Sequence, residues 1–403
     1  MTDDALRRID AVTQVGLRIA RSAPSGRVAL ARLAAAIDPA WIPRPWGMQI
    51  LEELDAARAA ALDPIGFKRI ERILRDAWAA PVTDELEELD PDPVAVTAGA
   101  QVHRGVLDGS PVAIKVLRPG LAASIRQDLA LLEGLIGPLE AAFPKVNARA
   151  LLREARERVL DELDFEHEAQ VQRRFHRALR GHPFLTVPAP VTRLAHETVL
   201  VSEWVDGVPL RAAPDRDEAA ARLVVFAIGS ARAGIIHADL YPEDVLVTGD
   251  GRLAILDFGA TRTVEAERVG LAAALLEAFV TRDAGAFGET LEHLGWLPAA
   301  HAGTALDLGL HSLGELAGPE TATLDTDAVL AARERLLGRP DQVVELALAA
   351  AVPPEDLWPT RGLGQLFGTI ARVGATGPWR ELVRAALRDG WDARPDGPTR
   401  ASV

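Results

Sequence analysis

The chain has 403 residues, of which 48% are hydrophobic and 25% charged, and its formal net charge is -14 at pH 7. These proportions are ordinary for a globular protein, and the acidic balance argues against nucleic-acid binding, which needs a basic face. The absence of cysteine excludes disulfides, thiolate nucleophiles and cysteine-based zinc sites. No apolar run approaches the roughly 18 residues that cross a membrane, and the first residues do not resemble a secretory signal. We therefore expect a cytoplasmic protein without a transmembrane helix.

The first 90 residues have the spacing of amphipathic helices. Apolar residues recur every three or four positions in QILEELDAARAAAL and in FKRIERILRDAW. The acidic segment EELDPDPVAV that follows contains two prolines and indicates a linker. We predict an N-terminal helical extension over residues 1–90.

A smaller lobe based on strands is predicted for residues 91–210. The segments AQVHRGVL and PVAIKVL alternate in polarity and flank Asp-Gly, which is a strong signal for a β-hairpin. Helices are expected over 121–142 and 147–180. The segments FLTVPAPVTRL and ETVLVSEWV predict two more strands.

Residues 211–392 are predicted to form a mainly helical lobe. A helix over 216–233 precedes a second hairpin in DVLVTGDGRLAILDFG, and helices follow Thr263 almost to the end of the chain. The last residues, 393–403, have the composition of a disordered tail. The order of elements predicts an α+β architecture with two lobes.

Lys115 is one of only three lysines in the chain and lies in the apolar strand PVAIKVL. Alternation along a strand places Val112, Ile114 and Val116 on one face and Lys115 on the other. An ammonium buried there without a partner would cost several kcal/mol. Lys115 therefore either reaches water from an edge strand or acts as a point charge on nucleotide phosphates, held by a glutamate.

The candidate glutamates lie in the acidic segment DELDFEHEAQ. Asp164 and Glu168 are four residues apart and are expected to share a helix face, from which Glu162 points away. The alternative is a solvated acidic face that forms salt bridges with the arginines of LLREARERVL.

Two aspartates, Asp239 in HADLYPEDVLV and Asp257 in LDFGA, each follow a short apolar strand. Phosphoryl transfer needs an acceptor for the proton of the attacking hydroxyl and carboxylates that hold Mg²⁺ between phosphates. Asp239 suits the first task, and Asp257 and Asp244 suit the second. The combination H-x-D, an acidic residue five positions later, a hairpin and D-F-G is far more specific than D-F-G alone.

In these motifs the chain resembles the UbiB/AarF-like atypical kinases, a family associated with ubiquinone and related isoprenoid-lipid metabolism. The resembling segments are PVAVTAGAQVHRGVLDGSPVAIKVLRPG, ELDFEHEA, SEWVDGVPL, HADLYPEDVLV and LDFG, in the family's order over about residues 90–265. The resemblance implies a two-lobed protein-kinase-like fold with an N-terminal helical extension and a largely helical C-lobe.

The resemblance also implies ATP and Mg²⁺ as cofactors and assigns roles to residues. Lys115 would pair with Glu168 and meet the phosphates, Asp239 would be the catalytic aspartate, and Asp244 and Asp257 would be the metal ligands. The residues expected at the nucleotide are Ala95, Thr97, Ala98, Gly99, Ala113, Lys115, Glu203 and Val205.

Several positions depart from the family pattern. Asp244 stands in place of the family's Asn, which adds a negative charge beside the phosphates, although aspartate can also bind Mg²⁺. The family's N-terminal K-x-G-Q signature is missing, because its Lys, Gly and Gln would fall on Val28, Leu30 and Ala31. Glu162 is thereby expected to lose its usual Lys partner.

The residues around the motifs argue against a protein kinase. Ala238 stands where protein kinases keep an Arg, and no A-P-E-like anchor follows Gly259. We expect a phosphotransferase or ATPase that acts on or near an isoprenoid lipid or quinone precursor. A nucleotide-binding pseudokinase scaffold and a metabolite kinase of the aminoglycoside or choline type are the alternatives. Contact with the membrane is expected to be peripheral at most.

Overall fold

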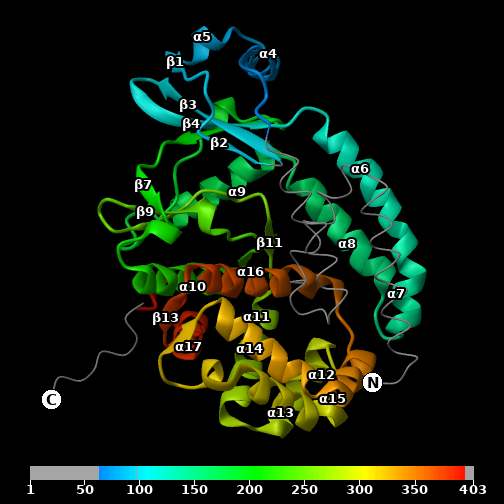
Figure 1. The fold of residues 1–403 in the computed structure, drawn as a ribbon. Helices are drawn as coiled ribbons and strands as arrows, with labels where there is room; N and C mark the ends of the chain where they lie inside the picture. Colours follow the sequence, from blue (N-terminus) through cyan, green and yellow to red (C-terminus); the bar gives the residue numbers. More distant parts are fainter. Residues whose placement is uncertain (1–62, 98, 395–403) are drawn as a thin grey trace, which may run out of the picture.

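The computed structural model describes residues 63–97 and 99–394, and every structural statement below refers to these residues. The helices expected before residue 63, Ala98 and the tail from residue 395 lie outside them. Figure 1 shows a sheet-containing N-lobe at the top, a larger helical C-lobe below it and a group of long helices along one side. This arrangement is the two-lobed α+β fold that the sequence predicts.

The N-lobe is built on an antiparallel sheet in which β3 pairs with β1, β2 and β4, and β4 pairs with β6. Its predicted hairpin turns at Asp108 and Gly109, whose φ angles of 49° and 71° are those of the tight turn that Asp-Gly favours. Lys115 lies on β4 between β3 and β6, so it is not an edge-strand lysine. The strands are β1 Glu88–Leu89, β2 Ala95–Val96, β3 Ala100–Leu107, β4 Ser110–Leu117 and β6 Val199–Glu203.

One face of this sheet is covered by α4 (Phe67–Trp78), which precedes a short helix α5 (Val82–Glu85). Ile70 and Leu74 of α4 are fully buried and belong to the same hydrophobic cluster as Ile114 of β4. The alternation of β4 thus directs its branched side chains to α4 and leaves the opposite face, with Lys115, for the space between the lobes.

The helices expected over 121–142 and 147–180 are each divided in two. The elements are α6 Leu121–Leu131, α7 Ile136–Ala142, α8 Ala148–Asp161 and α9 Phe165–Ala178. The prediction that Asp164 shares a helix face with Glu168 is wrong, because Asp164 is the N-cap of α9. Its carboxylate accepts hydrogen bonds from the amides of Glu166 and His167 at 3.0 and 3.1 Å.

The strand expected in FLTVPAPVTRL is reduced to β5 (Leu185–Thr186), which pairs with the C-lobe strand β10 in parallel. Pro188 and Pro190 lack the amide donors of a regular ladder, and Pro190 forms only an isolated bridge with Ser202. The second predicted hairpin is confirmed as β9 and β10, which lie between β7 and β5 in a four-stranded sheet. Besides β5, this sheet consists of β7 Gly207–Pro209, β9 Val245–Thr248 and β10 Leu253–Ile255.

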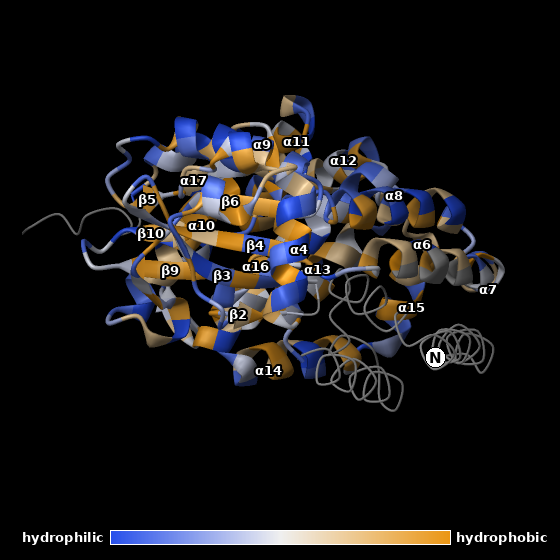
Figure 2. Ribbon diagram, turned by 90° about the horizontal axis from the view of Figure 1, so that it is seen from above, coloured by the Kyte–Doolittle hydropathy of each residue, from blue (hydrophilic) through white to orange (hydrophobic). Residues whose placement is uncertain are grey.

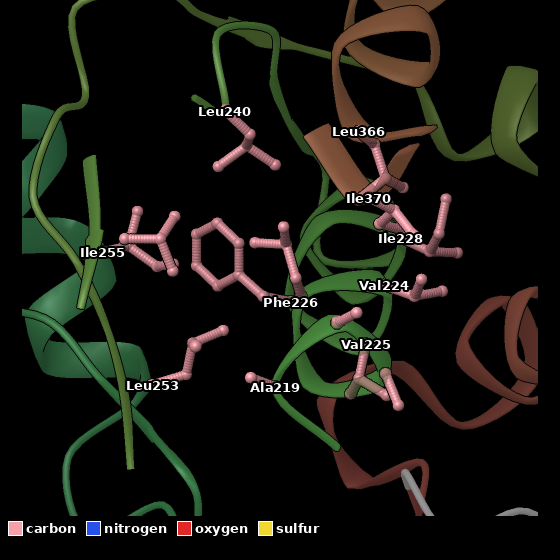
Figure 3. Close-up of a cluster of buried hydrophobic side chains, with 14 of the residues drawn as sticks. Ala219, Val224, Val225, Phe226, Ile228, Leu240, Leu253, Ile255, Leu366 and Ile370 are labelled. Atoms are coloured by element: carbon pink, nitrogen blue, oxygen red, sulfur yellow. The ribbon is translucent and has the colours of Figure 1, made fainter. Parts of the chain in front are cut away.

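The centre of the C-lobe is α10 (Arg216–Arg232), in the place where a helix is predicted over 216–233. Its apolar residues pack against β9, β10, α16 (Leu357–Val373) and α17 (Trp379–Asp389). Figure 3 shows Phe226 of α10 between Ile255 and Leu366. Figure 2 shows α10 and β9 largely in the hydrophobic colour. This core carries a small two-stranded sheet of β8 (Ile235–His237) and β11 (Thr261–Thr263).

The rest of the C-lobe is helical apart from a pair of short strands, β12 and β13, which the sequence did not predict. The elements are α11 Ala266–Thr281, α12 Ala284–Leu294, α13 Ala302–Leu313, β12 Ala322–Leu324, α14 Thr326–Leu337, α15 Pro340–Ala349 and β13 Ala375–Gly377. Within residues 63–97 and 99–394, no helix is both long and apolar enough to cross a membrane.

Candidate active site

A pocket lies between the lobes and collects most of the polar residues singled out from the sequence. It is lined from the N-lobe by the loop before β3 and by β4, from the side by the turn between α8 and α9, and from below by the loops after β8 and β10. The lining residues are Thr97, Gly99, Ala100, Lys115, Leu117, Glu162, Phe165, Glu168, Asp239, Asp257, Gly259 and Ala260.

Lys115 is the cation at the centre of this pocket. Its Nζ lies 2.9 and 3.0 Å from the two carboxylate oxygens of Glu168 on α9, and 2.8 Å from Oδ2 of Asp257. The ammonium also lies 4.8 Å from the ring centroid of Phe165. Lys115 and Glu168, which are 53 residues apart in sequence, are therefore paired as the resemblance implies.

One ammonium shared by two carboxylates, the buried one of Glu168 and the partly exposed one of Asp257, leaves this cluster with an excess negative charge. Burial and the neighbouring Asp257 carboxylate raise the pKa of Glu168 to about 7, although Lys115 opposes them. Burial acts on Asp257 in the same direction, but Lys115 and the Gly259 amide outweigh it and lower the pKa of Asp257 to about 2. An additional cation in the pocket would therefore be electrostatically favourable.

Asp239 lies in the loop after β8, which we call the catalytic loop and which covers residues 237–244. His237 fixes this loop: its Nε2 lies 2.6 Å from the carbonyl oxygen of Asp257, and its Nδ1 accepts the Asp239 amide at 3.4 Å. Its ring packs edge-on against Phe258 and Phe226. Burial lowers the pKa of His237, so the ring is a neutral structural link between the two aspartate loops.

Asp244 ends a short 3-10 turn (Pro242–Asp244), and its carbonyl oxygen accepts the Leu256 amide at 3.0 Å. This bond holds the Asp244 and Asp257 loops side by side. Burial, followed by the negative charges of Asp257 and Asp239, raises the pKa of Asp244 well above its usual value. The negative charges of Asp239 and Asp257 thus act on Asp244, although Asp244 itself is not among the residues that line the pocket.

The carboxylates of Asp244 and Asp257 fit a divalent cation whose remaining ligands do not come from the protein. Asp244 and Asp257 offer the oxygen donors that Mg²⁺ prefers, and their mutual repulsion would be relieved by a cation. Among the described residues no group of three or more His, Asp or Glu could hold a metal alone. Mg²⁺ commonly completes such a two-carboxylate site with phosphate oxygens and water.

Arg361 of α16 is a site residue that the sequence analysis missed. Its side chain is 1% exposed, and its Nη1 donates to Oε1 of Glu162 at 2.8 Å while Nη2 lies 2.9 Å from Oδ1 of Asp239. The guanidinium also lies 5.0 Å from the Trp358 ring centroid. Glu162 therefore has an arginine of the C-lobe as a cationic partner, while the predicted loss of its usual Lys partner concerns residues 28–31, which lie outside the described residues. The available signal was a lone Arg on the apolar face of the helix LWPTRGLGQLF.

The residues expected at the nucleotide are only partly brought together. Thr97 and Gly99 line the pocket, and the Thr97 hydroxyl fixes their loop by accepting the Gly99 and Ala100 amides. Ala95 lies on β2 and Ala113 on β4, and neither is among the lining residues.

Glu203 and Val205, which are also expected at the nucleotide, belong to the segment 203–206 that connects β6 to β7, and neither lines the pocket. The Glu203 amide and side chain bond to Ala189, and the Trp204 amide donates to the Pro111 carbonyl at 3.1 Å. Two amides of this segment are thus engaged within the protein, and the Val205 assignment stays a prediction.

The two lobes, the Lys115–Glu168 pair and the paired aspartate loops define a protein of the kinase-like class. The model of the ABC1 atypical kinase-like domain matches residues 59–291, more than half of the chain. The chain therefore belongs to the ABC1 atypical kinase-like family. Curated proteins of the UbiB and AarF-domain kinds are similar to it in sequence.

Among similar curated proteins, a probable protein kinase UbiB of Marinobacter nauticus is 28% identical over 251 residues, which cover 58% of this chain and 46% of that protein. An uncharacterized aarF domain-containing chloroplastic protein kinase of Arabidopsis thaliana is 32% identical over 230 residues, covering 56% and 33%. The chain thus matches less than half the length of these relatives. The solved Rv3197–erythromycin complex from Mycobacterium tuberculosis has a similar fold, with a TM-score of 0.62, 23% identity and 92% of each chain covered.

Proposed function

We propose that the chain binds Mg²⁺·ATP between its lobes and is an atypical kinase or ATPase of the UbiB type, acting in or regulating isoprenoid-quinone or lipid metabolism rather than phosphorylating proteins. The observation that carries this proposal is the placement of Lys115, Glu168, Asp239 and Asp257 around one pocket. These are the groups that phosphoryl transfer requires, and three of them come from segments far apart in the sequence.

Each residue has a role that its surroundings support. Lys115 already contacts two carboxylates at hydrogen-bond distance, and phosphate oxygens can compete for its ammonium while Glu168 keeps it in place. Asp239 accepts the proton of the attacking hydroxyl or water. At the same time the oxygen of that hydroxyl or water bonds to the γ-phosphorus, and the bond between the γ-phosphorus and the leaving ADP oxygen breaks. Asp244 and Asp257 would hold Mg²⁺, which offsets the negative charge of the phosphates.

The short connection after the D-F-G motif argues against a protein substrate. β11 ends at Thr263 and α11 begins at Ala266, so only two residues separate them. Ala238 is fully buried and donates its amide to the Ala260 carbonyl at 2.8 Å. Between the D-F-G motif and α11 there is therefore no long peptide-docking segment, and the buried position 238 has no space for an Arg that could contact a phosphorylated loop.

The proposed substrate class rests on the family resemblance. We propose an isoprenoid lipid or quinone precursor as the acceptor or effector, reached by a cytoplasmic protein through peripheral contact with the membrane. The deciding experiment measures phosphate release from Mg²⁺·ATP for the wild type and for Asp239→Asn, with and without liposomes that contain a polyprenyl phenol.

Turnover that the liposomes stimulate and that Asp239→Asn abolishes would support the proposal. Equal background release from both proteins would reject the enzyme. If ATP still raised the melting temperature in that case, a nucleotide-binding scaffold would replace it. Stimulation by an aminoglycoside or choline instead of the lipid would favour a metabolite kinase.

A further inference from the structure

The Asp239 carboxylate is held by a cation that lies outside every motif of the catalytic region. Arg361 is 122 residues further along the chain by numbering, and its guanidinium bridges Asp239 at 2.9 Å and Glu162 at 2.8 Å. Arg361 is 1% exposed, whereas the Asp239 side chain is 26% exposed and lines the pocket. The arginine therefore holds the aspartate from the buried side and leaves part of it open to the pocket.

The contact belongs to a continuous face of α16 that follows the catalytic loop. At positions separated by four residues, Arg361 contacts Asp239, Gln365 donates to the Tyr241 hydroxyl at 3.1 Å, and Thr369 donates to the Leu240 carbonyl. Three successive loop residues are thus fixed by one helix.

Glycine at position 362 permits this close approach. A Cβ there would lie 2.9 Å from the His237 carbonyl oxygen, a distance that backbone atoms do not tolerate. The helix and the loop are therefore packed backbone to backbone beside the ion pair, and small shifts of α16 would move Asp239.

We propose that Arg361 is the positioning residue for Asp239, and that it couples the catalytic loop to the α8–α9 turn (residues 162–164) through Glu162. The consequence for turnover rests on the proposed function. Asp239 shares its surroundings with Asp244 and Asp257, and all three are acidic. Without the guanidinium, repulsion from these carboxylates would turn Asp239 away from the attacking hydroxyl.

Arg361→Met tests this role directly, because it removes the charge and keeps much of the side-chain volume. A displacement of about 1 Å can cost about 100-fold in rate, so we expect a fall in kcat of that order with the KM for ATP changed less than about threefold. Arg361→Lys restores a charge without the two-pronged geometry and should recover part of the lost kcat.

The matched control is Arg384→Met. Arg384 also bridges two carboxylates, Glu277 and Glu381, but on the outer surface of α17. This variant should retain wild-type turnover. A role of Arg361 that is merely structural would instead lower the amount of active protein and leave the kcat of the folded fraction unchanged.

A double mutant identifies the partner through which Arg361 acts. If the arginine positions Asp239, adding Arg361→Met should lower no further the residual turnover of Asp239→Asn, measured at high enzyme concentration. Multiplicative losses, or full kcat in folded Arg361→Met, would overturn the proposal. Should Arg361→Met not fold, Glu162→Gln removes only the second carboxylate that anchors the guanidinium, and an unchanged kcat in that variant would also overturn the proposal.

Failure of the proposed function is visible separately, as a wild type that does not turn over ATP. The pairing is then tested on stability alone, by comparing the melting temperatures of Arg361→Met, Asp239→Asn and the double mutant. Strongly non-additive shifts would show that Arg361 holds Asp239 in the folded protein. Additive shifts would refute the pairing whatever the activity.

Discussion

Two ion clusters in this molecule each consist of one cation between two carboxylates, but the two cations differ in burial. In the Lys115 centre, one ammonium meets Glu168 and Asp257; in the Arg361 centre, one guanidinium meets Glu162 and Asp239. Lys115 is 20% exposed and faces the pocket, whereas Arg361 is 1% exposed behind it. The difference supports the two proposed roles, exchange of a carboxylate for a ligand phosphate at Lys115 and fixed support of Asp239 by Arg361.

Arg361→Met should have the largest effect on stability. Removing one partner of a buried ion pair leaves an uncompensated charge and costs about 3–5 kcal/mol, and here two carboxylates, Glu162 and Asp239, lose the same partner. Urea unfolding monitored by circular dichroism measures this loss. A cost below that of the Arg384→Met control would mean that the two centres do not differ as described.

Lys115→Met should cost less, about 1–3 kcal/mol, because Glu168 can take up a proton when the ammonium is gone. The pKa of Glu168 is already raised to about 7 by burial and by Asp257. A carboxyl whose folded-state pKa lies above its unfolded value stabilises the fold only while protonated, and that stability is lost as pH rises through the folded pKa.

The destabilisation by Lys115→Met, measured by urea unfolding, should therefore be larger at pH 8 than at pH 6. Lys68→Met, on the exposed side of α4, is the control and should show no such trend. A cost that does not change with pH would contradict the assignment of Glu168 as the group that takes up the proton.

Asp244→Asn should raise the melting temperature of the metal-free protein by a few degrees at pH 8. Burial and the negative charges of Asp257 and Asp239 raise the pKa of Asp244, so the wild type loses stability as pH rises through that pKa and the variant does not. The gain should shrink towards pH 5 and should diminish when Mg²⁺ is added, because only the wild-type carboxylate binds the ion.

Thermal scans with and without Mg²⁺ check this prediction. Asp250→Asn, in the exposed turn between β9 and β10, is the control. Hydrogen bonds from Thr248 and Arg252 lower the pKa of Asp250 to about 2, so its substitution should give no gain at high pH. A loss of stability for Asp244→Asn at pH 8 would show that the carboxylate is not under like-charge repulsion.

The smallest effect is expected at the N-cap of α9. Asp164→Ala should cost about 1 kcal/mol, because two amides lose their acceptor, while Asp164→Asn should retain most of the stability. Neither variant should change turnover as Arg361→Met does. Thermal unfolding measures the stability of both variants. Equal losses of stability in Asp164→Ala and Asp164→Asn would argue against a capping role.

The sequence predicted the parts of the site that depend on local pattern. Asp-Gly fixed one hairpin and alternation placed Lys115 opposite α4, while the two aspartates follow short strands as expected. It failed where the outcome depends on partners distant in sequence. Glu162 and Arg361 are 199 residues apart, and no local signal connects them.

Two smaller errors also have physical causes. Helical spacing placed Asp164 on one face with Glu168, but the helix is interrupted between α8 and α9, and Asp164 caps α9 with a carboxylate that accepts the local amides. The strand expected after residue 184 was interrupted by Pro188 and Pro190, which cannot donate to a ladder.

The most direct test of the account is a titration of Mg²⁺·ATP into the wild type, Lys115→Met and Arg361→Met by calorimetry at pH 7.5. We predict that the wild type binds, that Lys115→Met binds at least about tenfold more weakly because it loses a charged contact to phosphate, and that folded Arg361→Met binds within about threefold of the wild type. A wild type that does not bind, or an Arg361→Met variant that loses as much affinity as Lys115→Met, would contradict it.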